Sequence, residues 1–408
     1  MKIILVTDYF YPSSIGGTEK YVFLLAKQLE FAGYDVRILT LSTSKKKGSY
    51  LGLNIDYIKP NTDNSSLVIK CISPSDNLSE FNDYMDFNTP NIVHFHTFTP
   101  NFNHFHFGLA STKGCKTFFT SHIPGHICPR GDFRFFNNSN CNGKLNRLKC
   151  SACYSNFKSK NFIEGAGLFV YNYMSKYSIS NLRRGLLHKI ANSVNQFITV
   201  SDWQLEILKK NGIYKNVSVC KQGIQGEKYE EHSRNSFTSP IRLGFLGRAC
   251  PEKGLHLLID VISKLPQNLF TLTISTPSPN IEHNSYFEKL QLKAKDIPNL
   301  NWIIDLNGEN IKSFFDSIDF LVVPSLCFET GPFVVNEAFM HQTPVLGSNL
   351  GGIKELVFEN VNGHLFEPNI NSIMDVILNL KKQNYIQYSF SARQSIQMFE
   401  EMKIIYEN

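Results

Sequence analysis

Residues 320–340 read FLVVPSLCFETGPFVVNEAFM and combine a strand signal with a helix signal. The apolar run Phe320–Pro324 has the length and composition of a buried strand. Thr330-Gly331-Pro332 then has the chemistry of a helix start, because proline suits the first helical turn. We therefore predict a strand, a loop and a helix in direct succession.

The same alternation extends outward over the whole chain. Thr18 can cap a helix that ends at Gly33, and Ser201 with Gln204 has the spacing of a capping box. Strand–helix alternation of this length indicates an α/β fold with mostly parallel sheets and helices on both faces. The predicted strands are Lys2–Thr7, Asp35–Leu41, Asn91–His96, Lys116–Ser121, Phe197–Val200, Ile241–Leu246, Phe270–Ser275, Trp302–Ile304 and Phe320–Pro324.

The length of 408 residues predicts two or three domains. A polar stretch at 225–240 interrupts the alternation, and we interpret it as a linker. It separates an N-terminal domain, residues 1–224, from a C-terminal domain, residues 241–388. The remaining residues, 389–408, form a predicted terminal helix.

The charge of the chain is distributed unevenly, although the net charge is only +6. Residues 113–190 hold 13 Lys and Arg against 2 Asp and Glu, with phenylalanine and tyrosine interleaved. This composition suits a solvated basic surface, a nucleic-acid site or a membrane-facing site. We expect no nucleic-acid partner, because no nucleic-acid-binding module is recognisable. The sequence has neither a transmembrane run nor a secretory leader, so we expect a cytoplasmic protein.

Residues near the predicted helix start have the chemistry of an anion site. The backbone N–H groups of Phe333 and Val334 would face an anion at the positive end of the helix dipole. Arg248 and Lys253 lie in the turn GRACPEKG, and two cations beside such a site suit a diphosphate. Glu329 and Glu337 could instead be the acid/base pair of a glycosidase. Their placement, one in the loop and one on the helix, favours two separate duties.

Three segments of the second half together resemble family 4 of the retaining, GT-B-fold glycosyltransferases: GRACPEKG, PSLCFETGPFVVNEAF and TPVLGSNLGGIKELV. GGTEKYVFLLAKQL and NIVHFH resemble the first domain of the same family. The resemblance covers nearly the whole chain. It implies two Rossmann-like, doubly wound domains that face each other across a cleft, with residues 389–408 packed back on the first domain.

The resemblance also implies roles for individual residues. Arg248 and Lys253 would bind the donor diphosphate and stabilise its growing charge, and the N–H groups of Phe333 and Val334 would hold phosphate. Glu337 would bind the ribose hydroxyls. Glu329, and His122 from the first domain, would contact the transferred sugar. The glycines expected at the donor site are Gly17, Gly247 and Gly331.

The implied reaction is retaining transfer of a hexosyl unit from a nucleotide-diphosphate sugar to a glycan. The sequence contains no Asp-x-Asp, so we expect no catalytic metal. A nucleotide-binding dehydrogenase is excluded because G-x-G-x-x-G is absent. A GT-B nucleotide-sugar epimerase and a non-catalytic nucleotide-sugar-binding protein remain alternatives. The basic segment favours a polyprenyl-diphosphate-linked acceptor and peripheral binding to the anionic inner face of the plasma membrane.

Four of the nine cysteines lie close together in an insertion of the first domain, about residues 123–165. Cys128, Cys141, Cys150 and Cys153 have the spacing C-x12-C-x8-C-x2-C, and the final pair is typical of thiolates that share one ion. The surrounding segment is polar, so a metal would supply ordering free energy that it lacks. We predict a structural zinc site, with His122 or His126 as possible replacements for one ligand. Free thiols and an iron–sulfur cluster are the alternatives.

Overall fold

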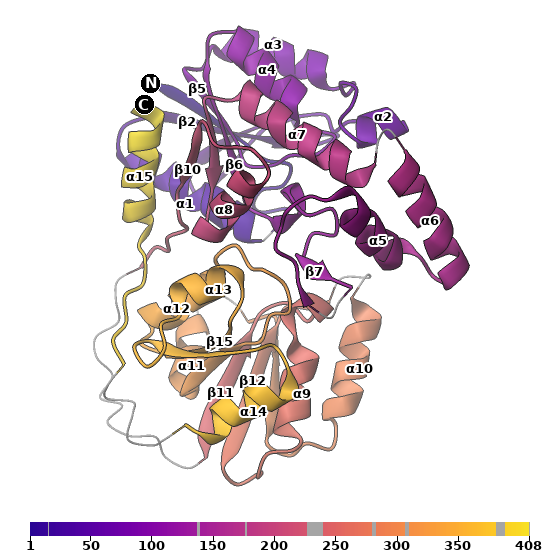
Figure 1. Ribbon diagram of the computed structural model, residues 1–408. Helices are drawn as coiled ribbons and strands as arrows, with labels where there is room; N and C mark the ends of the chain where they lie inside the picture. Colours follow the sequence, from indigo (N-terminus) through magenta and orange to yellow (C-terminus); the bar gives the residue numbers. More distant parts are fainter. Residues whose placement is uncertain are drawn as a thin grey trace. The chain divides into compact units, whose positions relative to one another are not determined.

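The computed structural model describes residues 1–14, 16–136, 139–175, 178–226, 240–279, 283–306, 310–380 and 388–407. The chain divides into two compact units (Figure 1). The first unit comprises Met1–Gly223 and Ser395–Asn408, and the second comprises Ile224–Gln394. Most of the linker predicted at 225–240 lies outside the described residues.

The first unit is built on an eight-stranded sheet in the order β10-β9-β6-β5-β1-β2-β4-β3. Seven strands run parallel, and β3 closes one edge as an antiparallel partner of β4. The strands are β1 (Lys2–Val6), β2 (Asp35–Leu41), β3 (Lys47–Tyr50), β4 (Leu53–Ile58), β5 (Ile92–Phe95), β6 (Lys116–Ser121), β9 (Gln196–Thr199) and β10 (Val217–Val219). Strand β1 is apolar from Ile3 to Val6 because helices cover both faces of the sheet, and these four residues are fully buried.

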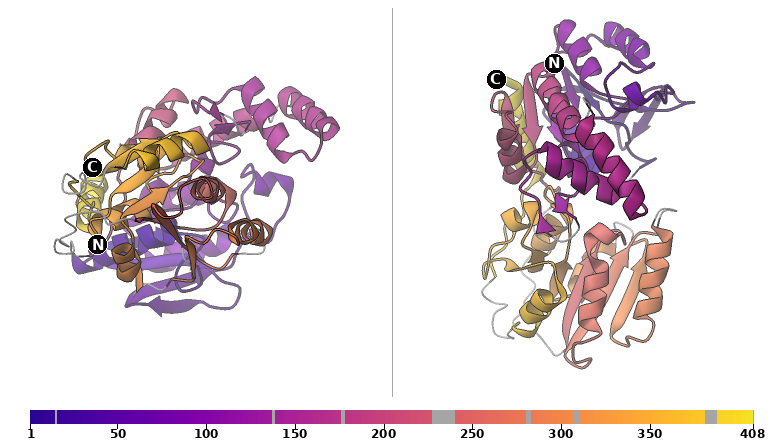
Figure 2. Two further views of the ribbon diagram at one scale, coloured as in Figure 1. Left: turned by 90° about the horizontal axis from the view of Figure 1, so that it is seen from below. Right: turned by 45° about the vertical axis from the view of Figure 1, so that its right-hand side comes forward.

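The helices of this unit include a terminal one that follows the whole second unit in the chain. They are α1 (Gly17–Phe31), α2 (Ser66–Ile69), α3 (Leu78–Asn88), α4 (His104–Thr112), α5 (Arg147–Lys158), α6 (Phe162–Met174), α7 (Ile179–Ser193), α8 (Asp202–Lys210) and α15 (Ser395–Glu407). Helix α15 is fixed at both ends: Gln28 donates to Ser395 Oγ at 3.1 Å, and the Tyr406 hydroxyl lies 2.7 Å from His94 Nδ1. The right view of Figure 2 shows α5, α6 and α7 as neighbours, in agreement with their contacts.

The second unit has a six-stranded, fully parallel sheet in the order β13-β12-β11-β14-β15-β16. Its strands are β11 (Ile241–Leu246), β12 (Phe270–Thr276), β13 (Leu300–Ile304), β14 (Phe320–Val323), β15 (Val345–Ser348) and β16 (Gly363–Phe366). Its helices are α9 (Leu255–Ile262), α10 (Asn284–Ala294), α11 (Ile311–Ser317), α12 (Phe333–Met340), α13 (Gly351–Leu356) and α14 (Ile370–Leu378). Alternate residues of β14 enter two separate cores: Phe320 and Val322 pack in one, and Leu321 and Val323 in the other. This period of two explains the unbroken apolar run.

The predicted strands are all present, with ends that differ by no more than two residues. Two predictions about helix starts are wrong, and a third is confirmed only in part. Gly16, not Thr18, is the N-cap of α1, and Pro332 is the N-cap of α12 instead of its first helical residue. Ser201 is the N-cap of α8 but does not accept a helix N–H. Instead, Gln204 Oε1 accepts from the Ser201 hydroxyl and from the Val200 N–H, so the capping box is incomplete.

Candidate functional site

The sheet order of the second unit points to one edge as its binding site. Strands β11 and β14 are neighbours in the sheet, but the chain leaves them for opposite sides of it. In open α/β sheets, ligands bind at the carboxyl ends of the strands where the order reverses in this way. Arg248 and Lys253 lie in the segment after β11, and Glu329 lies in the loop after β14. The topology therefore brings three predicted site residues to one place.

A glycine lets these two loops touch. Gly254 follows the short 3-10 turn Pro251–Lys253 and has φ +69°, a backbone conformation that disfavours side chains. A Cβ atom at Gly254 would stand 1.9 Å from the Pro324 carbonyl oxygen. The N–H of Leu326 also donates to the Glu252 carbonyl at 2.7 Å. Backbone contacts thus fix the loop after β11 against the loop after β14.

Lys253 and Glu329 form an ion pair across this junction. Lys253 Nζ donates to Glu329 Oε1 at 2.5 Å, and the Ser325 hydroxyl donates to the same oxygen at 2.8 Å. Burial alone would raise the pKa of Glu329, but the charge and hydrogen bond of Lys253 outweigh it and hold that pKa below its ordinary value. Burial opposes the charge of Lys253 as well, yet Glu329 raises its pKa. Both groups are therefore ionised at neutral pH.

Two further glycines hold the Glu329 loop from its other side. Gly351 has φ +49°, and a Cβ atom there would lie 2.7 Å from the Glu329 carbonyl oxygen. A Cβ at Gly352 would lie 2.5 Å from the Gly331 nitrogen, and the Gly352 N–H donates to the Glu329 carbonyl at 2.6 Å. Backbone atoms therefore contact the Glu329 loop on two sides: those of the loop after β11 on one side, and those of Gly351 and Gly352 on the other.

Helix α12 begins beside this loop with Phe333 and Val334, the two residues expected to present N–H groups. Gly331 just before it has φ +129°, so this approach to the helix needs glycine. Glu337 lies in the second turn of α12 and is half-buried. Arg248 is exposed, and its charge contributes to the lowered pKa of Glu329. Gly247 directly follows β11, where its N–H donates to the Ser275 carbonyl at 3.1 Å.

The first unit presents a histidine cluster at the carboxyl ends of β5 and β6. His122 is buried, and its Nε2 lies 3.0 Å from His96 Nδ1. The Tyr21 ring packs edge-on against His122 with 4.6 Å between ring centroids. Burial lowers the pKa of His122 to about 3, so the ring is neutral at neutral pH. Gly17, the other predicted residue of this unit, is the exposed first residue of α1.

The sequence interpretation missed several residues that shape these places. Ser325 ends the apolar run of β14, and a hydroxyl at the carboxyl end of a parallel strand could have marked it as a site residue. Gly254 follows Lys253 within the quoted turn, but only the structure shows which backbone it contacts. His96 is not among the predicted site residues, and it is the hydrogen-bonding neighbour of His122.

Comparison with known families assigns both halves of the chain. Residues 15–227 match the model described as Glycosyltransferase Family 4, and residues 228–394 match Glycosyl transferases group 1. The chain belongs to glycosyltransferase family 4. The resemblance drawn from the motifs is therefore confirmed.

Relatives of this family 4 chain include enzymes of bacterial polysaccharide synthesis. An amylovoran biosynthesis glycosyltransferase from Erwinia amylovora is 27% identical over 44% of this chain and 46% of its own length. A lipopolysaccharide 1,2-N-acetylglucosaminetransferase from Salmonella typhimurium is 27% identical over 37% of this chain and 44% of its own length. The matched part thus spans about half of these curated relatives.

Solved structures match the family 4 chain over its whole length. Sucrose-phosphate synthase from Thermosynechococcus elongatus has a TM-score of 0.69 at 14% identity, with 100% of this chain and 98% of the other covered. Anabaena HepE, solved with UDP and glucose, has a TM-score of 0.66 at 14% identity, with 100% of both chains covered. At these identities the likeness shows the fold, which is that of GT-B glycosyltransferases as expected. None of the helices in the described ranges has the combined length and hydropathy that a bilayer span requires.

Proposed function

We propose that this chain transfers a hexosyl unit from a nucleotide-diphosphate sugar to a hydroxyl of a glycan acceptor, in the assembly of a polysaccharide. The observation that carries the proposal is the Lys253–Glu329 pair at the switch point of the second sheet. A cation fixed beside a helix N-terminus suits a diphosphate leaving group, whose negative charge grows as the sugar departs. The match to polysaccharide-synthesising relatives supports the same class of acceptor.

Each group of the site has a defined duty in this proposal. Lys253 and Arg248 balance the diphosphate charge, and the N–H groups of Phe333 and Val334 bind phosphate oxygen. Glu337 binds the ribose hydroxyls, and Glu329 accepts hydrogen bonds from the sugar while it orients Lys253. His122 stays a predicted contact of the transferred sugar. With a folded-state pKa of about 3, it would act as a neutral hydrogen-bonding group.

We also propose that the anomeric configuration is retained and that no catalytic metal is required. The two basic side chains and the helix start supply the positive charge that a metal ion supplies in other transferases. Attack from the face of the departing diphosphate would give retention without a protein nucleophile. Turnover should survive chelation of Mg²⁺ and Mn²⁺ while folding is monitored. Loss of turnover on chelation, with recovery when Mg²⁺ is added, would contradict the proposal that no catalytic metal is required.

A donor screen tests the reaction class. Thermal shift with uridine, guanosine, adenosine and thymidine diphosphate sugars identifies the bound donor, because a ligand at 100 times its Kd stabilises by about 2.7 kcal/mol. Incubation of that donor with glycan acceptors should then yield a new glycosidic bond with the donor's anomeric configuration. An epimerised sugar would indicate an epimerase, and binding without turnover would indicate a non-catalytic protein.

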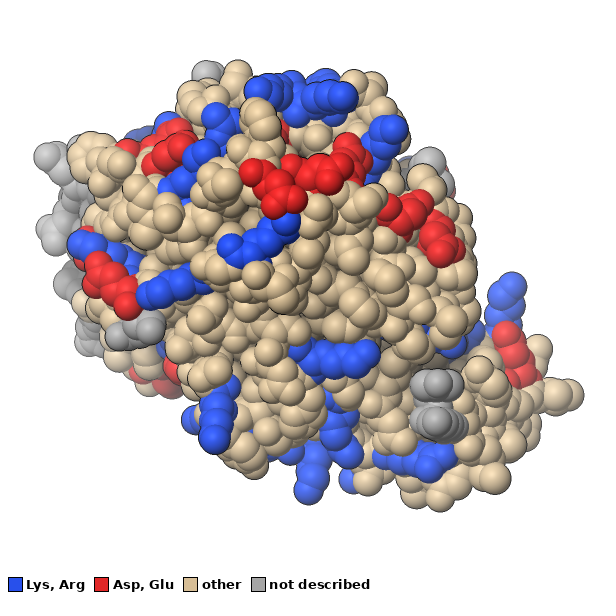
Figure 3. Space-filling model, turned by 90° about the horizontal axis from the view of Figure 1, so that it is seen from above, with Lys and Arg blue, Asp and Glu red and all other residues tan. Residues whose placement is uncertain are grey.

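A surface of the first unit supports a lipid-linked acceptor. Helix α6 is apolar yet almost wholly exposed: Phe162, Ile163 and Met174 are 88%, 84% and 71% exposed. A cavity of about 580 Å³ beside it is lined by aromatic rings, including Phe162 and Phe169, and by Lys160. Figure 3 shows a face of the molecule whose lower half carries mainly basic side chains. Exposed aromatic groups among basic residues are typical of peripheral binding to anionic lipid.

We therefore propose that the acceptor is polyprenyl-diphosphate-linked and that α6 contacts an anionic membrane surface. Flotation should show binding to vesicles with anionic lipid, weakening with salt because exposed charges are screened. Phe162→Ser with Ile163→Ser should reduce that binding at least tenfold. Phe87→Ser is the matched control, since Phe87 is 83% exposed on α3 of the same unit. Equal binding to neutral and anionic vesicles would contradict the proposal.

A further inference from the structure

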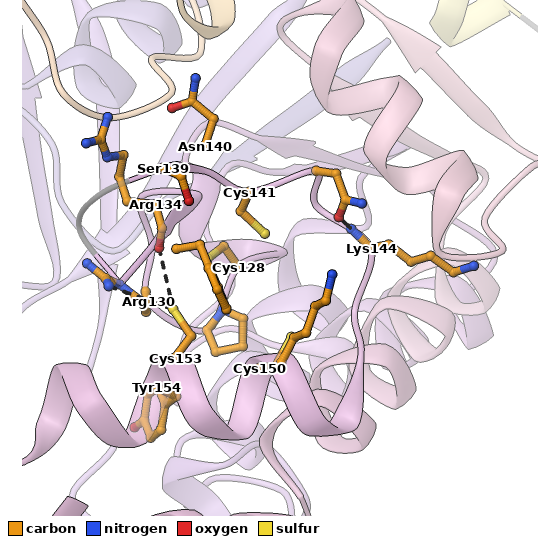
Figure 4. A pocket seen from close by; sticks show the side chains of 14 residues that line it. Cys128, Arg130, Arg134, Ser139, Asn140, Cys141, Lys144, Cys150, Cys153 and Tyr154 are labelled. Carbon is orange, nitrogen blue, oxygen red and sulfur yellow. Dashed lines mark hydrogen bonds between the residues drawn. The ribbon is translucent and has the colours of Figure 1, made fainter.

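Four cysteines that are separated in sequence line one cavity of the first unit (Figure 4). The cavity has a volume of about 290 Å³. Three local structures supply its thiols. Cys128 follows the short 3-10 turn Pro124–His126, Cys141 follows the hairpin of β7 (Arg134–Phe135) and β8 (Ser139–Asn140), and Cys150 and Cys153 belong to α5. The predicted cysteine set is thus gathered around a single space.

The local backbone explains why these thiols face the same space. Cys150 and Cys153 are three residues apart on α5, so their side chains lie on one face of the helix. The Cys141 N–H donates to the Phe133 carbonyl at 2.7 Å, which joins the end of the hairpin to its beginning. The Cys153 thiol lies 3.5 Å from the Arg134 carbonyl oxygen, which ties the helix to the same hairpin.

The charge around the cavity favours an anionic cluster. The described lining residues include four basic side chains and no acidic one; the basic ones are Arg130, Arg134, Lys144 and Lys149. Arg130 Nη1 lies 3.8 Å from Cys153 Sγ. Four thiolates around one Zn²⁺ carry a net charge of −2, which Arg134, Lys144 and Lys149 would offset; Arg130 is also paired with Asp132 at 2.8 Å.

We propose that Cys128, Cys141, Cys150 and Cys153 bind one structural Zn²⁺ through four thiolates. Binding releases the thiol protons to solvent and forms four zinc–sulfur bonds, with no change of oxidation state. Closed tetrahedral thiolate sets are characteristic of structural zinc. This site is independent of the donor chemistry proposed for the second unit.

In the part of the chain that the structure describes, no three His, Cys, Asp or Glu side chains lie close enough together to hold a metal ion. Zinc–sulfur bonds of about 2.3 Å therefore require the four thiols to approach one another more closely than they do in this structure.

The structure favours thiols over histidine as the fourth ligand. None of the described residues that line the cavity is a histidine. His126 Nδ1 lies 2.9 Å from the Ser121 hydroxyl, and His122 Nε2 faces His96. Both histidines, which the sequence allowed as replacements, are therefore engaged elsewhere.

Metal analysis of protein purified without added metal tests the proposal. We expect about one zinc per chain, and replacement by Co²⁺ should give the visible absorption of a tetrahedral cobalt thiolate. Cys150→Ser and Cys153→Ser should each lower zinc affinity at least tenfold. Cys115→Ser is the matched control, because Cys115 is a buried thiol of the same unit that donates to the Pro90 carbonyl at 3.2 Å. It should bind zinc like the wild type.

A second readout keeps the test valid if a variant folds poorly. The chain has two tryptophans, and Trp203 packs edge-on against Phe133 with 5.4 Å between ring centroids. Removal of zinc by a chelator from the wild-type chain should change Trp203 fluorescence and leave that of Trp302, in the second unit, unchanged. Absence of metal with four titratable thiols in the folded protein would overturn the proposal. So would a disulfide within the set, or iron in place of zinc.

Discussion

The donor-site loops of the second unit and the histidine and cysteine clusters of the first unit handle their buried polar groups in opposite ways. The second unit pairs full charges, Lys253 with Glu329, inside loops that are fixed by backbone contacts of Gly254, Gly351 and Gly352. In the two clusters of the first unit the titratable side chains are neutral instead: burial lowers the pKa of His122 and raises that of Cys141. The Lys253–Glu329 pair is already ionised when a charged ligand binds. The neutral histidine and cysteine side chains become charged only when they gain or lose a proton.

The two candidate sites also differ in whether the backbone or the side chains determine their structure. In the second unit the backbone determines the site, and side-chain positions follow from close glycine contacts. In the segment around α5 and α6 the side chains carry the chemistry, on a scaffold with an open cavity and an exposed apolar helix. Substitutions in the two units should therefore have different consequences, and four predictions test this difference.

The largest effect is expected from loss of the paired cation. Lys253→Ala should lower turnover by about 10²–10³, because one preorganised charge partner of the leaving group is removed. Turnover with saturating donor is the measurement, and unfolding of the second unit is followed through Trp302. Lys312→Ala is the control, since Lys312 pairs with Asp316 at 2.6 Å on the surface of α11. Near wild-type turnover of Lys253→Ala would contradict the proposed role of Lys253 in stabilising the diphosphate leaving group.

Glycine substitutions test whether the backbone determines the second site. Gly254→Ala should cost at least about 2 kcal/mol, from a strained positive φ and from overpacking against Pro324. Gly167→Ala on α6 should be neutral or stabilising by up to about 1 kcal/mol, because a Cβ there meets no atom within 4 Å. Urea unfolding followed at Trp302 and Trp203 compares the two. A similar loss of unfolding free energy in Gly254→Ala and Gly167→Ala would contradict the idea that the backbone determines the site of the second unit.

Acid should destabilise the first unit before the second. The pKa of His106 is lowered to about 3 by burial, whereas the unfolded chain binds the proton near pH 6.5. Stability is therefore lost as pH falls from 6.5 toward 3, by about 1.4 kcal/mol per pH unit for each such histidine. His106→Gln should reduce that slope in the first unit, since Gln can replace its capping contact with the Asn103 N–H.

Two Trp→Phe variants separate the signals of the units in this experiment. Trp203 reports the first unit and Trp302, which packs against Phe287, reports the second. Coincident acid transitions with an unchanged slope in His106→Gln would show that the buried histidines do not govern acid stability.

The smallest effect on stability is expected on the exposed face of α6. Phe162→Ser and Ile163→Ser should change the free energy of unfolding by less than about 0.5 kcal/mol, because both side chains are exposed. The same substitutions should weaken vesicle binding as proposed above. A large loss of stability would mean that another part of the molecule covers this face.

The fold could be predicted because its signals are local. Each central strand of a doubly wound sheet is a short apolar run, so strands such as Asp35–Leu41, Lys116–Ser121 and Ile241–Leu246 were assigned with their observed ends. Helix starts were less predictable. Thr18 and Ser201 have capping chemistry, but the position of a cap depends on backbone angles that tertiary packing sets.

The residues of the candidate site could be predicted where a sequence motif is typical of a single kind of binding site. Lys253 and Glu329 were identified as site residues, yet their direct pairing was not, because 76 residues separate them. The role of Gly254 required knowledge of the backbone that it contacts. The sequence also offered His126 as a zinc ligand, and only the structure shows that its ring faces Ser121.

The terminal helix makes the first unit discontinuous in the chain. Helix α15 covers this unit with Met398, Met402 and Tyr406, all buried, while the entire second unit lies between β10 and α15 in sequence. A ribosome must therefore synthesise all of the second unit before the first can be completed. Until then, the surface that α15 covers, including Cys220 and His94, stays open on the nascent chain. The unit whose synthesis begins first is therefore the one whose chain is completed last.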